Sequence, residues 1–399
     1  MSKSAGLTPG RWAVISVSMV LASMGMVALL HALETPQPLK SELPGEAHLY
    51  RWRRRSIFYK VLGAAEAPPL VLLHRPEIGA SGHEMARIMA PLAETYRVYT
   101  LDLLGFGLSD RPGVEYSTEL YNTLCQDFLR EIVGGSATLL ASGLSCNYAV
   151  AVAASAPELC ASLILISPSA LQGKQPIALT QYAEQPLIKA LLYPLLSTYL
   201  AFRLTNRLQQ TLKEDFARFY ANTRQLGAEH AAMARVAGRL TDNVEAQFER
   251  LQQPVLMIWG TQALDSQPTV ANLQKATALA NPRQARKVEL VQGAALVAHT
   301  EQPEDVVNMI RHWQQETSFS LAASLDKAST GLNGEKAAEP ATASGDEIEK
   351  GEVIAYCVKC KQRRKMLNAH KVIMKNGRPA MRGACSVCGS GINRIGDLN

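Results

Sequence analysis

The sequence lacks the cysteine pattern of a secreted protein held together by disulfides. It contains seven cysteines in 399 residues, and Cys125 and Cys160 lie in apolar surroundings, where they are typical small core residues. Cys146 also lies in an apolar segment, while the other four cysteines form two C-x-x-C pairs near the C-terminus. This distribution excludes the dense disulfide framework of a small extracellular domain.

Acidic residues are absent from residues 356–394, which contain ten lysines and arginines. The formal net charge of +6 is therefore local and offers a basic surface to nucleic acid phosphates, acidic lipids or a protein partner. Aromatic residues make up only 6% of the chain, and Tyr356 is the only one in this stretch, which argues against base recognition by stacking. Hydrophobic residues make up 47% of the sequence, which excludes a disordered protein and is enough for a large core.

Charge is also missing from residues 12–30, and the neutral run continues to Leu33. At about 1.5 Å per residue this run spans a hydrocarbon core of about 30 Å. We predict an N-terminal tail at 1–10 and a transmembrane anchor at 11–33, with membrane contact through residues 12–33. The alternative is a cleaved signal peptide, but the end of the run lacks small residues in an A-x-A arrangement.

The side of the membrane on which the body lies is not fixed by flanking charge. Lys3 and Arg11 precede the span, while Lys40 and the "RWRRR" segment at 51–55 follow it. A cluster of thiolates at the C-terminus is better kept in a reducing compartment. We therefore predict a single-pass membrane protein with a cytoplasmic body.

Short apolar runs alternate with helical patterns after a polar connector at 34–49. This alternation predicts an α/β fold with a doubly wound, mostly parallel sheet in a domain at 50–316. Residues of about 170–253 interrupt it with helical patterns only, which predicts a helical cap over the carboxyl ends of the strands. A segment at 317–353 rich in Ala, Ser and Gly predicts a flexible linker before a small module at 354–399. The predicted strands are 69–73, 97–101, 137–142, 162–167, 254–259 and 287–291.

Four motifs in order make residues 50–316 resemble the α/β-hydrolase superfamily. They are "VLLHRPEIGAS", which resembles the oxyanion loop, "LDLLGFGLSDRP" at 101–112, "PVLMIWG" before the acid position and "GAALVAHTEQPEDV" at the histidine position. The resemblance implies the α/β-hydrolase fold and a nucleophile at a strained turn between strand and helix, flanked by small residues.

Two registers compete for the nucleophile position. "A-S-G-L-S" places Gly143 there, and "G-L-S-C-N" places Ser145 there. Pro157 lies fourteen residues after Gly143, as the family pattern has it, whereas the Ser145 register requires a two-residue deletion within a helix. The Ser145 register also puts Asn147 where the turn requires a small residue. The Gly143 register is therefore favoured.

The other two triad positions are also altered. The resemblance maps the general-base histidine onto Leu296 and the acid onto Ala263, with His299 at the second, structural histidine. Glycine and leucine transfer no proton, so the resemblance implies a degenerate triad and a pseudoenzyme. The alternative is an active esterase-like enzyme with Ser145 or Cys146 as nucleophile, His299 as base and Asp265 as acid.

Arg75 and Pro76 follow His74 where the family has glycine in the oxyanion loop. The arginine places a cation near the vacant nucleophile position. It either holds an anionic ligand or fills space while its charge reaches solvent, and the second interpretation is favoured.

The C-terminal module carries the spacing C-x2-C-x24-C-x2-C, formed by Cys357, Cys360, Cys385 and Cys388. Four thiolates complete a tetrahedron around one structural Zn²⁺, and a module this small needs the metal to fold. Two disulfides are the alternative, and His370 between the pairs is not needed as a ligand. The segment also resembles a bacterial zinc-ribbon family of uncharacterised function.

Together these features predict a membrane-anchored binding or scaffolding protein. It would use the old substrate cleft for a small apolar ligand, or the basic ribbon for a protein partner. The alternatives are the active hydrolase and a zinc-ribbon protein associated with nucleic acid.

Overall fold

The computed structural model describes residues 9–168, 182–205, 213–262, 274, 277, 286–331, 354–357, 362–373, 379–385 and 391–395. The chain divides into two compact units, Met1–Ser329 and Thr330–Asn399.

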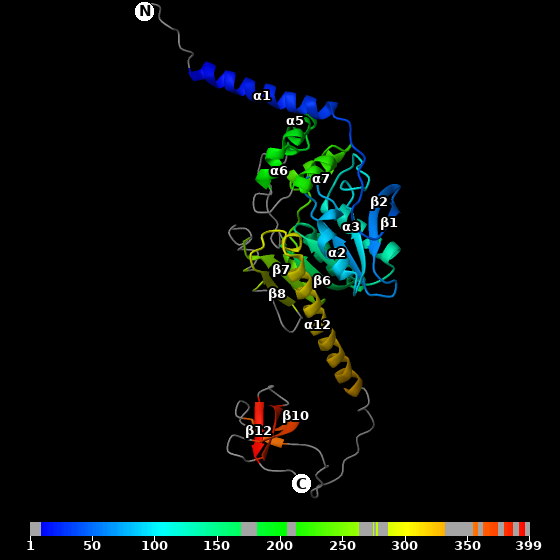
Figure 1. The fold of residues 1–399 in the computed structure, drawn as a ribbon, viewed down its shortest axis with the longest axis vertical. Coiled ribbons are helices and arrows are strands. Elements are labelled where there is room, and N and C mark those ends of the chain that lie inside the picture. Colours follow the sequence, from blue (N-terminus) through cyan, green and yellow to red (C-terminus); the bar gives the residue numbers. More distant parts are fainter. Residues whose placement is uncertain are drawn as a thin grey trace, which may run out of the picture. The chain divides into compact units, whose positions relative to one another are not determined.

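An eight-stranded sheet forms the centre of the first unit, in the order β1-β2-β4-β3-β5-β6-β7-β8 (Figure 1). The pairs from β4 through β8 are parallel, whereas β1–β2 and β2–β4 are antiparallel. The predicted mostly parallel sheet is therefore confirmed, and every predicted strand is present within two residues. The strands are β1 (Glu46–Trp52), β2 (Arg55–Leu62), β3 (Pro69–Leu73), β4 (Arg97–Leu101), β5 (Ala137–Ser142), β6 (Cys160–Ile166), β7 (Val255–Gly260) and β8 (Arg286–Val291).

The β1–β2 hairpin is the part of this sheet that the sequence did not predict. Its turn is made by Arg53 and Arg54, which both adopt left-handed backbone conformations (φ 49° and 65°). Tight hairpins need this conformation, but glycine or asparagine usually supplies it. The first strand of the sheet begins at Glu46, four residues before the predicted start of the domain, and the "RWRRR" segment comprises the end of β1, the turn and the first residue of β2.

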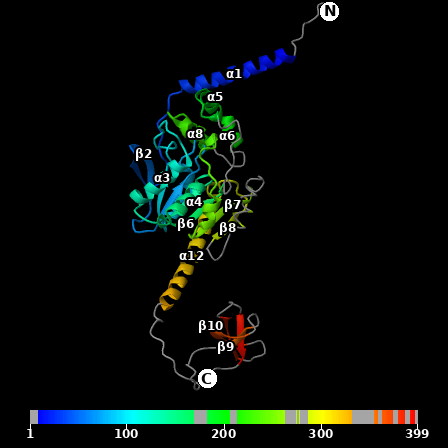
Figure 2. The same cartoon turned by 180° about the vertical axis from the view of Figure 1, so that it is seen from behind.

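Helices cover both faces of the sheet, as the two opposite views in Figures 1 and 2 show. On one face, α3 (Thr118–Phe128), α4 (Ser145–Ser155) and α9 (Glu245–Arg250) contribute buried side chains to one apolar cluster. On the other face, α2 (Ala86–Leu92) and α12 (Pro303–Gly331) contribute to a second cluster. The short turns η1 (Gly82–Met85), η2 (Leu129–Val133), η3 (Pro157–Leu159) and α11 (Ala298–Glu301) connect these elements.

Between β6 and β7 the described residues form helices and no strands, as the predicted cap requires. The cap helices lie between α1 and the sheet (Figure 1). They are α5 (Pro186–Leu196), α6 (Tyr199–Thr205), α7 (Lys213–Thr223) and α8 (Ala228–Val236), followed by α9. Tyr193, Met233 and neighbouring alanines form a small core of their own inside the cap.

Two long helices extend beyond predicted boundaries. The linker was predicted from residue 317, but α12 continues to Gly331 because Ala, Ser and Leu in this stretch are compatible with a helix. At the other end, α1 (Pro9–Leu33) begins two residues before the predicted anchor. Within it, Ile15–Leu33 is long and apolar enough to cross a membrane, by length and composition.

The second unit contains a four-stranded antiparallel sheet in the order β12-β11-β10-β9. Its strands are β9 (Ile354–Cys357), β10 (Gln362–Ile373), β11 (Pro379–Cys385) and β12 (Gly391–Ile395).

Candidate functional site

The sharp turn between β5 and α4 is the centre of the candidate site. Gly143 occupies it with φ +57°, and its N–H donates to the carbonyl of Ile166 on the neighbouring strand (2.9 Å). A residue with a Cβ is strained in this left-handed conformation, whereas glycine adopts it freely. The structure thus places Gly143 at the turn between β5 and α4, while its assignment to the nucleophile position stays a prediction.

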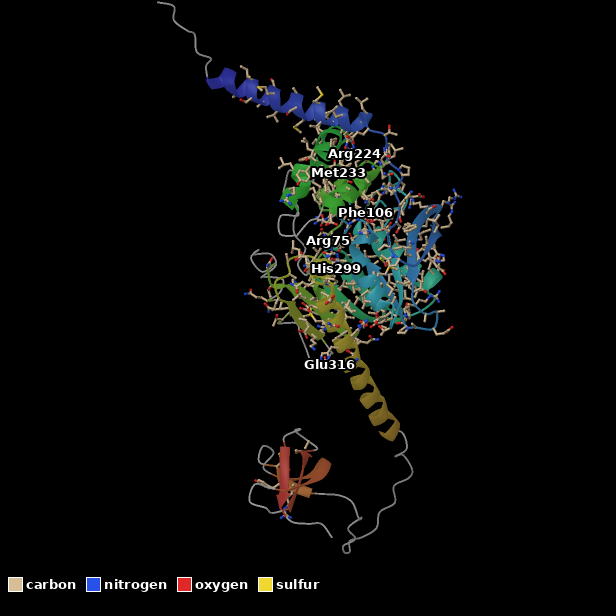
Figure 3. The ribbon with its side chains drawn as sticks, in the orientation of Figure 1. Arg75, Phe106, Arg224, Met233, His299 and Glu316 are labelled. Atoms are coloured by element: carbon tan, nitrogen blue, oxygen red, sulfur yellow. The ribbon has the colours of Figure 1, made fainter. Side chains whose placement is uncertain are left out.

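Arg75 fills the space that a side chain at position 143 would occupy. A Cβ built on Gly143 would lie 2.7 Å from Cγ and 2.8 Å from Cδ of Arg75, closer than carbon atoms approach. The aliphatic part of Arg75 therefore lies directly over the bare backbone of the turn. Figure 3 shows Arg75 and His299 near one another, below the cap.

The charge of Arg75 is balanced inside the protein by Glu84. The backbone N–H and the Nε–H of Arg75 both donate to Oε2 of Glu84, at 3.1 and 3.3 Å. The other carboxylate oxygen, Oε1, lies 3.1 Å from Nε2 of His299. We call Arg75, Glu84 and His299 the buried charge cluster.

Electrostatics keep Glu84 ionised in this cluster. Burial by itself raises the pKa of the carboxyl, but the positive charge of Arg75 and the contact with His299 outweigh it. The pKa of Glu84 is consequently far below its ordinary value of 4.5. The carboxylate is an ionic partner for Arg75 and does not act as a proton donor near neutral pH.

The structure does not bring Ser145 or Cys146 together with His299. The Ser145 hydroxyl donates to the carbonyl oxygen of His74 (2.6 Å), and the Cys146 thiol donates to the carbonyl of Ala141 (3.3 Å). Both side chains are fully buried in α4, and burial raises the pKa of the Cys146 thiol well above its ordinary range. No hydrogen bond in the described part of the chain links His299 to either residue.

The remaining triad positions are described in part. Leu296 is partly buried in the loop after β8, whose Ala295 N–H donates to the carboxylate of Glu301 (2.5 Å). Ala263 and Asp265 lie outside the described residues. The assignment of the histidine position to Leu296, a hydrocarbon side chain, stays a prediction of the sequence resemblance.

The turn after β4 keeps its motif and its polar contacts. The carboxylate of Asp102 accepts hydrogen bonds from the N–H groups of Gly82 (2.5 Å) and Leu108 (2.7 Å). Ser109 donates its hydroxyl to the Asp102 carbonyl (2.6 Å), and Gly107 has φ +52° with the carboxylate where a Cβ would be. His74 belongs to the same structure, because its Nδ1 contacts the Arg75 carbonyl and its Nε2 accepts from the Leu103 N–H.

Glu84 is the site residue that the sequence motifs missed. It precedes α2 and falls on the apolar stripe formed by Met85, Ile88, Met89 and Leu92. An acid on a buried stripe requires a cationic partner. The position of Glu84 on an apolar stripe was therefore the sequence feature from which the buried charge cluster could have been predicted.

The second unit contains the predicted zinc ligands, of which the structure describes two. Cys357 is the last residue of β9 and Cys385 the last of β11, and both are buried. Cys360 and Cys388 lie outside the described residues. Burial at the end of a strand fits thiolates that start a metal-binding turn, while no cluster of three potential metal ligands occurs among the residues described. The zinc site therefore stays a prediction.

Comparisons with known families match both units. Residues 70–309 match the alpha/beta hydrolase family, and residues 356–395 match a domain of unknown function (DUF5679). The first match covers more than half of the chain, whereas the second adds no activity.

Relatives with curated descriptions match shorter segments. A 2-hydroxy-6-oxo-6-(2'-aminophenyl)hexa-2,4-dienoic acid hydrolase of Metapseudomonas resinovorans is 27% identical over 114 residues, which are 28% of this chain and 39% of that protein. An uncharacterized protein of Mycobacterium tuberculosis is 32% identical over 104 residues, which are 26% of this chain and 30% of that protein. The chain thus spans well under half the length of these relatives.

Solved structures support the fold. A membrane phospholipase A described as a bacterial virulence factor matches 77% of this chain and 97% of its own, with TM-score 0.55 and 21% identity. The epoxide hydrolase CorEH matches 68% and 99%, with TM-score 0.56 and 19% identity. An alpha/beta hydrolase fold protein from Burkholderia ambifaria matches 68% and 99%, with TM-score 0.56 and 23% identity. At these identities the likeness concerns the fold alone.

Proposed function

Because this chain belongs to the alpha/beta hydrolase family, we propose that it is a member without hydrolase chemistry, serving as a membrane-anchored binding or scaffolding protein. One observation carries the proposal. The turn that holds the nucleophile in this family is occupied by Gly143, and the side chain of Arg75 fills the space above it.

The neighbouring groups support the same conclusion. Triad catalysis needs a hydroxyl or thiol, a base to take its proton and an acid to orient that base. Leu296, at the predicted histidine position, has no basic atom. The Ser145 hydroxyl donates its hydrogen bond to a backbone carbonyl. His299 is in contact with Glu84, which is itself paired with Arg75. Among the described residues at this turn, no hydroxyl or thiol lies beside a base that could activate it for attack on a carbonyl carbon.

Burial favours a scaffold over a receptor for a small apolar ligand. Ser142, Ser145 and His299 are fully buried, and a charged cluster lies among them. A small apolar ligand beside Gly143 would have to displace a buried ion pair, which costs several kcal/mol. The binding role in this proposal therefore belongs to the protein's surfaces.

An ester hydrolysis assay tests the inactive centre. Full-length protein in detergent is incubated with short-chain p-nitrophenyl esters and with a fluorophosphonate probe for active serines. We expect turnover at the detergent background and no labelling. Turnover that disappears in Ser145→Ala but persists in Ser142→Ala would establish the rearranged hydrolase instead. Ser142 is the matched control because it is equally buried and has no hydrogen-bond partner in the described structure.

The same proposal includes one structural Zn²⁺ held by Cys357, Cys360, Cys385 and Cys388, and a cytoplasmic body. Metal analysis of the purified full chain should give one zinc per molecule, and Cys385→Ser should remove it. Zinc-free protein with intact thiols would contradict the zinc site. The basic ribbon makes a protein partner or nucleic acid its candidate ligand, and binding to nucleic acid would weaken steeply with added salt.

A further inference from the structure

Exposed apolar side chains concentrate on the cap. Outside α1, the described residues contain nine large hydrophobic side chains that are exposed, and all except Leu49 and Tyr356 belong to residues 182–226. Leu187 and Leu200 are 74% and 67% exposed, and Tyr199 is 57% exposed. Scattered apolar residues are ordinary on a protein surface, but a concentration on one subdomain indicates an interaction surface. The members on the cap are Tyr182, Leu187, Ile188, Tyr199, Leu200, Tyr220 and Leu226.

The cap also contacts the candidate membrane helix. Helix α5 packs against α1, and the ring of His31 on α1 meets the ring of Tyr193 on α5 edge-on at 5.6 Å. Met24, Val27, Ala28 and His31 are partly covered, whereas Met26, Leu29 and Leu30 are exposed. The covered positions are spaced as one face of a helix. Thus α5 covers one face of the last turns of α1.

The depth of this contact matters. Met24 lies nine residues before the end of α1 at Leu33, so the covered face reaches about 13 Å from the helix end. If α1 crosses a bilayer, a helix packed on this face lies at the level of the hydrocarbon. Helix α5, "PLIKALLYPLL", has eleven residues and cannot span the bilayer itself.

Polar contacts take over where α1 ends. The carboxylate of Glu34 pairs with the guanidinium of Arg224 and accepts a hydrogen bond from the Tyr220 hydroxyl (2.6 Å). Further along the connector, Gln225 donates to the carbonyl of Gln37 (2.8 Å). Figure 3 labels Arg224 at this junction. Apolar contacts within the span and ionic contacts just beyond it match the order of hydrocarbon and headgroups.

From these observations we propose that α5 and the beginning of α6 form a second membrane contact. They insert Leu187, Ile188, Tyr199 and Leu200 into the leaflet at which α1 ends, and their partner is lipid. The inference rests on the membrane anchor in the proposed function and adds that the cap lies in the interface beside it. The short apolar helix and its tyrosine neighbour are typical of an interfacial segment.

A photo-crosslinking experiment tests this inference on the full chain in phosphatidylcholine nanodiscs. p-Benzoylphenylalanine replaces Leu187, Leu200, Leu29 or Leu49 one at a time, and lipid adducts are counted by mass spectrometry after irradiation. Leu29 on α1 is the positive control, and Leu49 on β1, 63% exposed, is the matched exposed leucine away from the cap. We expect adduct yields at Leu187 and Leu200 similar to that at Leu29 and roughly ten-fold above that at Leu49.

The controls separate the possible failures. Lipid adducts at Leu29 without adducts at Leu187 and Leu200 would refute the second contact and leave the anchor intact. No adducts at Leu29 would refute the anchor, and this inference with it. Adducts between Leu187 and another copy of the chain, in place of lipid, would show that the cap surface is covered by protein and would also overturn the proposal.

Discussion

The turns after β4 and β5, at the carboxyl ends of two central strands, differ in the polar groups that they carry. After β4, the motif of the family is present and each polar group of Asp102 is hydrogen-bonded. After β5, the backbone of the turn is present, but Gly143 brings no functional group and Arg75 covers it. The first turn is held by hydrogen bonds of Asp102, whereas the second presents the backbone of Gly143 beneath the side chain of Arg75. The two turns therefore differ in the polar groups that they carry, and the proposed loss of hydrolase chemistry concerns only the second.

The largest effect should come from breaking the intact turn with Asp102→Ala. The substitution leaves the buried N–H groups of Gly82 and Leu108 without acceptors, and we expect a loss of about 4 kcal/mol in the free energy of unfolding. Urea unfolding of the full chain in detergent measures it. The matched control is Asp110→Ala, whose carboxylate accepts one exposed hydrogen bond from Ser56 and should cost about 1 kcal/mol. Equal losses in the two variants would contradict the structural role of Asp102.

Next in size is the buried charge cluster beside the second turn. Glu84→Gln removes the charge that pairs with Arg75, and breaking a buried pair in this way costs about 3 kcal/mol at neutral pH. Glu94→Gln is the control, because its exposed pair with Arg311 contributes less than about 1 kcal/mol. If the two variants unfold at the same urea concentration, the cluster does not stabilise the centre.

The contribution of the same cluster to the stability of the unmodified protein should depend on pH. The pKa of Glu84 is lowered in the folded state, so its ionic contribution is complete above its ordinary pKa of 4.5. That contribution is lost as the pH falls from there through the lowered pKa, because protonation then favours the unfolded chain. Urea midpoints measured between pH 7 and pH 3 should fall less steeply for Glu84→Gln than for the unmodified protein. Parallel curves would show that Glu84 does not titrate in this way.

Gly143→Ser tests whether the turn between β5 and α4 accepts a nucleophilic side chain. The serine would be strained at φ +57° and would press against Arg75, so we expect a loss of about 2 kcal/mol and no ester hydrolysis. Gly134→Ser is the control for backbone strain, because Gly134 has φ +77° and nothing lies within 4 Å of a Cβ built there. The difference between the two losses measures the contact with Arg75. Hydrolysis by Gly143→Ser alone would mean that a base survives near the turn.

The smallest expected effect belongs to Ser145→Ala. It removes one buried hydrogen bond to the carbonyl of His74, worth about 1 kcal/mol of unfolding free energy. Thermal unfolding should show the loss, while Ser142→Ala should be neutral because the Ser142 hydroxyl has no hydrogen-bond partner among the described residues. A Ser145→Ala variant as stable as the parent would remove the structural role assigned to this hydroxyl.

Strands and cap were predictable because each carries a strong local pattern. Continuous apolar runs such as 69–73 and 137–142 predicted β3 and β5 at their observed bounds. The β1–β2 hairpin was not predicted, because its turn has two arginines in a conformation that is usually adopted by glycine or asparagine. The end of α12 was predicted as a linker, because small residues are compatible with both a linker and a helix.

Within the candidate site, the sequence names only residues that follow a family motif, and their assigned roles stay predictions. The positions of Gly143 and Leu296 came from motif register, since the turn and the terminal segment keep their spacing. Motif register did not identify Glu84 as the partner of Arg75. Glu84 is nine residues away in the sequence and contacts Arg75 because η1 packs against β3. The predicted choice between an anionic ligand and solvent for Arg75 was therefore incomplete: its charge is met by a carboxylate of the same chain.

The ion pair between Glu34 and Arg224 has a mechanical consequence. It joins the cap to Glu34, the residue that follows α1, so an outward swing of the cap requires this pair and the contact with Tyr220 to break. Tilting α1 and displacing α7 thus become one coupled motion. A bilayer that forces α1 to tilt would act on the cap through this joint.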